Sequence, residues 1–227
     1  MQIIYEDNHL IVVNKAPGEI VQGDKTGDQP LSEAVALYLK QRYNKPGNAF
    51  VGVVHRLDRP VGGLVIFAKT SKALERMNQL FREGKVEKHY WAIVANAPNP
   101  KQGRLIHWLK KNEKQNKSYA SNSPKDGAKR AELTYRTLAK SKNYTLLDVQ
   151  LLTGRHHQIR CQLAAIGSPI KGDLKYGAPR SNPDASISLL SYQINFEHPV
   201  SHLPISLTAP LPPDPLWQAF APTTPQN

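Results

Sequence analysis

"VVHRLDRPVGGLVIFAKT", Val53 to Thr70, joins apolar residues to a charged turn. The apolar residues before and after the turn read as strands buried on both faces, so Asp58 lies between Arg56 and Arg59 at the edge of a sheet. Nearby guanidinium groups favour the ionised carboxylate, which can act as a nucleophile or a base. On this stretch alone a solvated turn with weak surface ion pairs is the better interpretation. Motifs elsewhere in the chain are needed to choose between a solvated turn and a reactive carboxylate.

The length and composition predict one soluble domain over residues 1–227. With 227 residues and 40% hydrophobic content, the chain can bury a substantial core without disulfides or a structural metal. Cys161 is the single cysteine, and the first residues lack the basic flank and long apolar stretch of a signal peptide. We therefore expect a reducing, cytoplasmic setting. No apolar segment approaches the roughly 20 residues that span a bilayer, so no membrane partner is expected.

The charge predicts a polyanionic partner. Thirty Lys and Arg residues against 18 Asp and Glu residues give a formal net charge of +12. An anionic membrane surface would also attract this charge, but no Lys-rich amphipathic helix with a large apolar face is evident. Nucleic acid is therefore the expected partner.

Apolar periodicity predicts more strands than helices. Helices are expected at 30–44 with Ser32 as N-cap, at 71–84 with Ser71 as N-cap, and at 155–167. Strands are expected within 3–18 (two strands) and at 50–54, 63–69, 86–94, 104–110, 131–139, 144–152, 187–196 and 203–209. Because the strands do not alternate with the helices, we expect an α+β fold with a large mixed or antiparallel sheet.

Two segments read as irregular. Residues 101–130 are rich in Lys and Arg, and they contain a polar loop at 112–127, "NEKQNKSYASNSPKDG", that includes Tyr119. Such a loop is either a mobile solvated segment or a clamp for a phosphate backbone, and the sequence supports both interpretations equally. The Pro-rich C-terminal tail at about 211–227 is expected to be partly disordered.

A second charged motif runs from Leu151 to Gly177, "LLTGRHHQIRCQLAAIGSPIKGDLKYG". A helix that starts with several hydrogen-bond donors suits a phosphate or carboxylate group. On a helix from 155, His156 and Arg160 share a face while His157 points about 100° away. Taken alone, a basic solvent-facing helix is the better interpretation.

The motifs taken together resemble one enzyme family. "HRLDRPVGGLVIFAKT", "KHYWAIV" and "TGRHHQIRCQLAAIGSPIKGDLKYG" occur in this order, with "YEDNHLIVVNKAPG" before them and "DGAKRAELTYRTL" between them. This arrangement is similar to that of the RluA-type pseudouridine synthases and covers about residues 3–210. The resemblance implies a pseudouridine synthase fold, in which a curved sheet with flanking helices forms a basic cleft for RNA.

The resemblance also implies an activity, the isomerisation of a uridine in RNA to pseudouridine. Asp58 matches the catalytic aspartate of the family, Tyr90 its active-site tyrosine, and Arg160 the basic residue that pairs with the aspartate. Arg56 matches the arginine that fills the space left by a flipped nucleotide. Because no redox step or external group takes part in the reaction, no cofactor is expected, and no metal.

Further residues are expected around this site. The stacked base must leave the RNA helix and enter a pocket, where Tyr90 suits stacking, and side chains around it must hold the RNA. Asp173 and Tyr176 are expected to be structural. The additional RNA-binding candidates are His55, Arg59, Arg155, His156, Gln158, Lys110 and Lys111, and the candidate pocket walls are Leu64 and Ile159.

The sequence departs from the family pattern in two places. Pro60-Val61-Gly62-Gly63 replaces the usual Asp-Thr-Ser-Gly, and Lys15-Ala16-Pro17-Gly18 stands where Lys-Pro-x-Gly is common. The first change removes two hydroxyl groups beside Asp58 and raises the question of what holds that loop rigid. Family-like strands begin almost at residue 1, so we expect no N-terminal S4 RNA-binding domain.

Two other functions compete with this interpretation. A noncatalytic RNA-binding or RNA-chaperone module on the same fold would explain the altered loop, yet Asp58, Tyr90 and Arg160 are all present. A metal-dependent nuclease could use His55 and the two adjacent histidines, but no HExxH or CxxC spacing occurs. The family resemblance leaves the RNA open between ribosomal and transfer RNA. We expect a monomer without an obligate protein partner.

Overall fold

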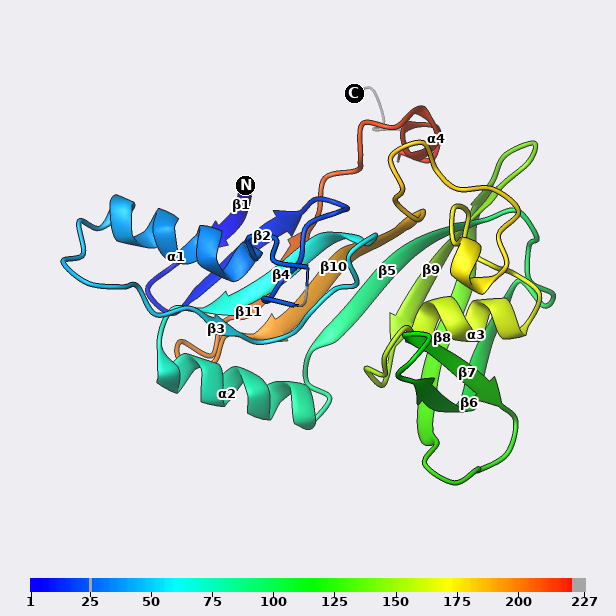
Figure 1. Ribbon diagram of the computed structural model, residues 1–227, viewed down its shortest axis with the longest axis horizontal. Helices are drawn as coiled ribbons and strands as arrows, with labels where there is room; N and C mark the ends of the chain where they lie inside the picture. Colours follow the sequence, from blue (N-terminus) through cyan, green and yellow to red (C-terminus); the bar gives the residue numbers. More distant parts are fainter. Residues whose placement is uncertain (25, 222–227) are drawn as a thin grey trace.

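A twisted eleven-stranded sheet runs through the structure (Figure 1). The computed structural model describes residues 1–24 and 26–221, and over these residues four α-helices flank the sheet. The predicted α+β class with a large mixed sheet is confirmed. The strands are β1 (Gln2–Glu6), β2 (Leu10–Lys15), β3 (Gly52–Val53), β4 (Gly62–Ala68), β5 (Glu87–Val94), β6 (Gln102–Asn112), β7 (Lys117–Ser121), β8 (Lys129–Lys140), β9 (Thr145–Leu151), β10 (Leu189–Glu197) and β11 (Pro204–Thr208). The helices are α1 (Leu31–Arg42), α2 (Ser71–Arg82), α3 (Gln158–Ala165) and α4 (Pro215–Gln218), with a 3₁₀ turn at Leu174–Tyr176.

The helices begin near the expected residues, but with different caps. Pro30 precedes α1 in place of Ser32, and no side chain caps this helix. Thr70 caps α2 in place of Ser71, because its side chain accepts a hydrogen bond from the Ala73 N–H. The described helices include none that is long and apolar enough to cross a membrane.

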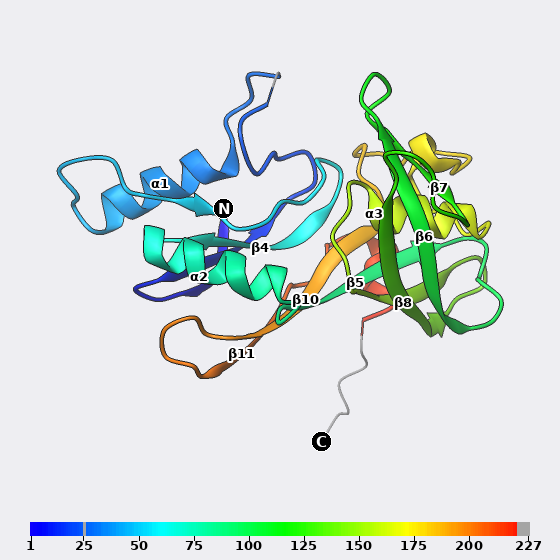
Figure 2. The ribbon, with the colours of Figure 1, turned by 90° about the horizontal axis from the view of Figure 1, so that it is seen from below.

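The sheet has two halves that meet at a narrow junction. The strand order is β1-β2-β4-β10-β5-β9-β8-β6-β7, with β3 beside β4 and β11 beside β10. Among the described strands, β4 and β10 form the one parallel pair, through Gly62 with Leu190 and Gly63 with Ser191. Figure 2 shows the half with α1, α2 and β4 beside the half with β6, β7, β8 and α3. The two halves therefore diverge from a junction only two residues long.

Alternating side chains divide the core into two layers. Tyr90, Ala92 and Val94 belong to one apolar cluster, which also receives α1 and α3. Trp91 and Ile93 belong to the other, which receives α2 and α4. The prediction that Tyr90 and Trp91 lie on opposite faces is confirmed.

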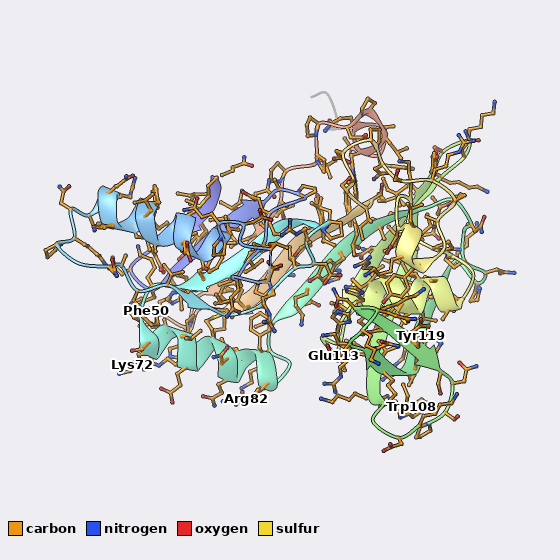
Figure 3. All side chains as sticks on the ribbon, viewed as in Figure 1. Phe50, Lys72, Arg82, Trp108, Glu113 and Tyr119 are labelled. Atoms are coloured by element: carbon orange, nitrogen blue, oxygen red, sulfur yellow. The ribbon has the colours of Figure 1, made fainter. Side chains whose placement is uncertain are left out.

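Two segments expected to be irregular are ordered. Residues 117–121, inside the polar stretch at 101–130, form β7 and pair with β6 as a hairpin. Figure 3 shows Trp108 and Tyr119 on this hairpin, and Glu113 at its turn. In the tail, Asp214 caps α4, and Trp217 and Phe220 are buried. The tail is therefore ordered over 211–221, while the expected disorder of its last residues, 222–227, lies outside the described residues.

The junction requires a glycine at position 63. Gly63 has a φ of +111°, and a Cβ atom there would lie 2.3 Å from the backbone oxygen of Ser191. We expect Gly63→Ala to lower the free energy of unfolding by roughly 3 kcal/mol, because backbone strain and a backbone clash add together. Urea unfolding followed by circular dichroism measures this.

A glycine at the end of α2 serves as the matched control. Gly84 has a φ of +69°, but a Cβ atom there would meet nothing within 4 Å. Gly84→Ala should therefore cost only about 1 kcal/mol. Equal losses in the two variants would show that contact with Ser191 does not restrict position 63.

Candidate active site

A cleft of about 830 Å³ lies where the two halves of the sheet diverge. Its walls come from the loop before β4, from β5, and from the segment that leads into α3. A second hollow of about 540 Å³ adjoins it and shares Arg56 and Asp58 with it. Segments far apart in the sequence therefore meet around one carboxylate.

Asp58 lies at the end of the loop that leads into β4. Its backbone oxygen accepts a hydrogen bond from the Val61 N–H at 3.0 Å, which fixes the turn. Its side chain is 29% exposed and accepts a hydrogen bond from Arg160 Nη1 at 2.9 Å. The carboxylate is therefore anchored on one side and open to the cleft on the other.

Arg160 is held on both sides by carboxylates. Its Nε and Nη2 donate to the two oxygens of buried Asp173, at 2.7 and 2.9 Å, while Nη1 reaches Asp58. The guanidinium also lies 5.1 Å from the centre of the Tyr176 ring. Burial disfavours the charge of Arg160, but hydrogen bonds and charges from Asp173 and Asp58 outweigh burial and raise its pKa. Asp173, expected to be structural, in fact orients the residue that holds Asp58.

Lys15 holds the loop that carries Asp58 through backbone oxygens. Its side chain is fully buried, and its Nζ donates to the backbone oxygens of Ala16, Arg59 and Val61 at 3.0, 3.0 and 2.7 Å. The Gly18 N–H adds a hydrogen bond to the Arg59 oxygen at 2.8 Å. Burial lowers the pKa of Lys15 to about 8. Sequence reasoning missed this residue, whose one available signal was the Lys15-Ala16-Pro17-Gly18 turn.

Tyr90 lies on β5 and lines the same cleft. Burial raises the pKa of its hydroxyl to about 12, the Asp58 charge acts in the same direction, and the Ser191 side chain opposes both. The phenol is therefore protonated at neutral pH and can donate a hydrogen bond.

The segment before α3 differs from the expected helix. Because α3 begins at Gln158, His156 does not share a helix face with Arg160. His157 is the N-cap residue, with a left-handed φ of +51°, and its ring stacks on that of His156 at 3.7 Å. This backbone conformation places His157 Nε2 3.6 Å from Asp58 Oδ2. His157, which the sequence analysis placed away from the site, is therefore a neighbour of Asp58.

Comparison with known proteins assigns this arrangement to a family. The family model described as RNA pseudouridylate synthase matches residues 9–165. The chain belongs to this family. The ribosomal large subunit pseudouridine synthase D of Zymomonas mobilis is 31% identical over 94% of this chain and 70% of its own. The ribosomal large subunit pseudouridine synthase C of Vibrio cholerae is 33% identical over 92% and 65%, respectively.

A solved structure shows the same fold. The structure of human RNA pseudouridylate synthase domain containing 4 aligns with a TM-score of 0.78 at 23% identity, over 93% of this chain and 89% of that one. The resemblance to RluA-type synthases is thus confirmed, and the protein is an RNA pseudouridine synthase.

Several of the predicted residues of this synthase line the cleft. Arg56 reaches Gln22 Oε1 only at a long 3.4 Å. Arg155 uses its Nε to hold the Arg130 backbone oxygen, which leaves its terminal nitrogens outside that bond. The others that line the cleft are Asp58, Tyr90, Arg160, His55, His156, Gln158, Lys111 and Ile159.

Other predicted residues have structural partners. Leu64 is fully buried in the opposite core cluster, so the prediction that it walls the pocket is wrong. Arg59 forms ion pairs with Asp28 at 2.7 Å and Asp24 at 3.8 Å, outside the main cleft. Lys110 is exposed on β6, but it does not line the cleft as its neighbour Lys111 does.

Two cleft residues are committed to the fold through their polar atoms. The Gln158 side-chain amide donates to the Glu132 backbone oxygen. It accepts from the Thr153 hydroxyl and the Arg155 N–H. His55 Nε2 accepts from the Ile66 N–H at 3.1 Å. These hydrogen bonds give Gln158 and His55 a structural role, and their expected contact with RNA stays a prediction.

The residues around the cleft do not form a cluster of metal ligands. Within 1–24 and 26–221, no group of three or more His, Cys, Asp or Glu side chains is arranged to hold a metal ion. His156 and His157 stack face to face, and Tyr176 and Ser118 occupy one nitrogen of each ring.

The partly buried His55 predicts a loss of stability in acid. Burial, reinforced by the Lys88 charge, lowers the pKa of His55 from 6.5 to about 3. Between these two pH values the unfolded chain binds a proton that the folded chain does not, so the free energy of unfolding falls as the pH falls. His55→Gln should reduce this slope by up to about 1.4 kcal/mol per pH unit, measured by urea unfolding between pH 3.5 and 6.5.

His202 provides the control for this measurement. It is exposed and lies outside the cleft. His202→Gln measures how much the loss of an exposed histidine changes the pH slope, and the change in His55→Gln should exceed it; equal changes in the two variants would contradict the assignment of His55.

Proposed function

We propose that Asp58 is the catalytic carboxylate of this RNA pseudouridine synthase. The observation that supports this most directly is the hydrogen bond from Arg160 at 2.9 Å to a carboxylate that is still 29% exposed to the cleft. An ionised carboxylate beside C1′ can attack that carbon or stabilise positive charge on it, and both routes need the open oxygen.

The other catalytic positions follow from the same geometry. Tyr90 offers its ring as a stacking surface for the target base and its protonated hydroxyl as a donor. Arg160 orients Asp58. Arg56, exposed at the boundary of the two hollows, enters the gap that the flipped nucleotide leaves.

The reaction rearranges the bonds of the uridine and needs no second substrate. The C1′–N1 bond breaks, the uracil turns within the cleft, and C1′ joins C5. The hydrogen on C5 is then lost as a proton, and N1 gains one. Buried walls such as Ile159 limit access of water to the detached uracil. This chemistry requires no cofactor.

The proposed substrate is ribosomal RNA of the large subunit. The Zymomonas and Vibrio relatives carry that substrate in their names, and the net charge of +12 suits a highly structured polyanion. We also propose that the enzyme works as a cytoplasmic monomer without an obligate protein partner, because residues of one chain line the whole cleft.

Removing the Asp58 carboxylate tests the proposed chemistry. Asp58→Ala should lower the turnover rate at least about 10³-fold, because the reacting carboxylate is lost. RNA affinity should stay within a few-fold. Turnover is measured by release of tritium from RNA labelled at uridine C5, since C5 loses its hydrogen in the reaction.

A cellular measurement identifies the substrate at the same time. Pseudouridine mapping of total RNA, from cells without the gene and from cells complemented with wild type or Asp58→Ala, should show sites in large-subunit RNA that only the wild type restores. Restoration by Asp58→Ala would refute the role of Asp58. Restored sites confined to transfer RNA would refute the substrate.

Neighbouring lysines on β6 test the RNA-binding surface. Lys111 lines the cleft and pairs in the sheet with Ser118, whereas Lys110 pairs with Tyr119 on the opposite face. Lys111→Ala should flatten the slope of log affinity against log salt by about 0.7 to 0.9, the value of one phosphate contact. Lys110→Ala is the matched control and should leave the slope unchanged. A larger effect from Lys110 would move the RNA path to the other face of the hairpin.

A further inference from the structure

A chain of hydrogen bonds leads from β7 to the edge of the active site. The Ser118 N–H donates to the Tyr176 hydroxyl oxygen at 2.8 Å. That oxygen lies 3.0 Å from His157 Nδ1. The other ring nitrogen of His157, Nε2, lies 3.6 Å from Asp58 Oδ2. His157 is thus the last member of a buried polar chain that ends beside the proposed catalytic carboxylate.

The chain determines which nitrogen of His157 carries the proton. A backbone N–H can only donate, so the Tyr176 oxygen accepts from Ser118 and its own proton needs an acceptor. Among the described residues, His157 Nδ1 is the one acceptor within hydrogen-bond distance of that hydroxyl. Nδ1 is therefore unprotonated, and the proton of the neutral ring lies on Nε2.

The ring is held neutral and in one orientation. Burial, together with the charge of Arg160, lowers the pKa of His157 to about 2. The ring stacks on His156 at 3.7 Å and meets the edge of the Tyr176 ring at 5.7 Å. The backbone of His157 is left-handed, a conformation that is uncommon for residues other than glycine. The ring is thus a preorganised, neutral hydrogen-bond donor.

The Nε2–H group has no close partner within the described residues. The carboxylate oxygen beside it, Asp58 Oδ2, is at 3.6 Å, which is too long for a hydrogen bond, and that oxygen already accepts from Arg160. His157 lines both hollows. A fixed donor without a partner, facing a substrate cleft, is matched to an acceptor on the substrate.

We propose that His157 contacts the target uridine and donates from Nε2 to O2 of the uracil ring. This inference rests on the proposed role of Asp58, because that role places C1′ beside the carboxylate. O2 is two bonds from N1, the atom that leaves C1′ with the electron pair of the glycosidic bond. The negative charge spreads from N1 onto O2. A neutral donor at O2 therefore binds the transition state more tightly than it binds the unreacted uridine.

The test combines enzyme variants with substrate analogues. The enzymes are wild type and His157→Asn, since asparagine tolerates the left-handed backbone but cannot reach O2. The substrates are short RNAs with uridine, 2-thiouridine or 2′-deoxyuridine at the target position. On uridine, His157→Asn should lower the single-turnover rate constant about 10²-fold and leave the RNA dissociation constant within about threefold.

The analogues separate the contact with O2 from other roles of His157. Sulfur is a weak acceptor, so on 2-thiouridine the difference between the two enzymes should shrink to within about threefold, whereas on 2′-deoxyuridine it should stay near 10²-fold. A difference that disappears only with 2′-deoxyuridine would overturn the proposal in favour of the ribose. A difference that is the same for all three RNAs would overturn it in favour of a purely structural role.

Two controls keep this result apart from folding and from the role of Asp58. His202→Asn replaces an exposed histidine that also has a positive φ and should leave all rates unchanged. Nitrogen-15 NMR of labelled histidine should show the Nε2–H form of His157, and the Nδ1–H form would overturn the proposal. If Asp58→Ala kept turnover, the proposed function would fail, while the analogue comparison would still report whether His157 contacts O2.

Discussion

The guanidinium of Arg160, shared between Asp58 and Asp173, is the interaction on which the active site depends. Through this hydrogen bond α3 holds the loop before β4, although Arg160 and Asp58 are 102 positions apart in the sequence. The sheet itself links the two halves of the site through only two residue pairs of β4 and β10. Two carboxylates and one guanidinium leave a net charge of −1 for this cluster. Removing Arg160 would therefore leave two neighbouring anions uncompensated, at a cost of about 3–5 kcal/mol for the buried one.

The loop that carries Asp58 is held through its backbone. The usual hydroxyl side chains after the HRLD motif are absent, since Pro60-Val61-Gly62-Gly63 replaces them. Lys15 donates to three backbone oxygens around this loop, which equals the number of donors on an ammonium group. Backbone contacts are insensitive to the side chains of the loop. The altered sequence is therefore compatible with a rigid position for Asp58.

Sequence reasoning succeeded where the two-residue period of a strand was enough, because neighbouring side chains on a strand point to opposite faces. The alternation along β5 correctly placed Tyr90 and Trp91 on opposite faces. It failed for Leu64, because β4 is buried along its whole length and offers no contrast by which to assign faces. β7 was missed because its residues, Lys-Ser-Tyr-Ala-Ser, are mostly polar and form an edge strand. His157 was misplaced because the helix begins three positions later than periodicity suggested, directly after a single left-handed residue, and periodicity carries no information about the sign of φ.

The net charge of +12 overstates the number of groups available to RNA. Glu132 pairs with both Arg104 and Arg130, Asp148 with Arg136, and Glu6 with Lys69. Arg160 and Lys15 are committed to the catalytic loop. Every one of these cations contributes to the long-range field that attracts a polyanion, but each already has a carboxylate or backbone oxygens as partners, which weakens its short-range attraction for a phosphate. The short-range contacts must therefore come from the few basic residues at the rim of the cleft, which makes affinity depend on a small part of the total charge and leaves the choice of uridine to the shape and donors of the cleft.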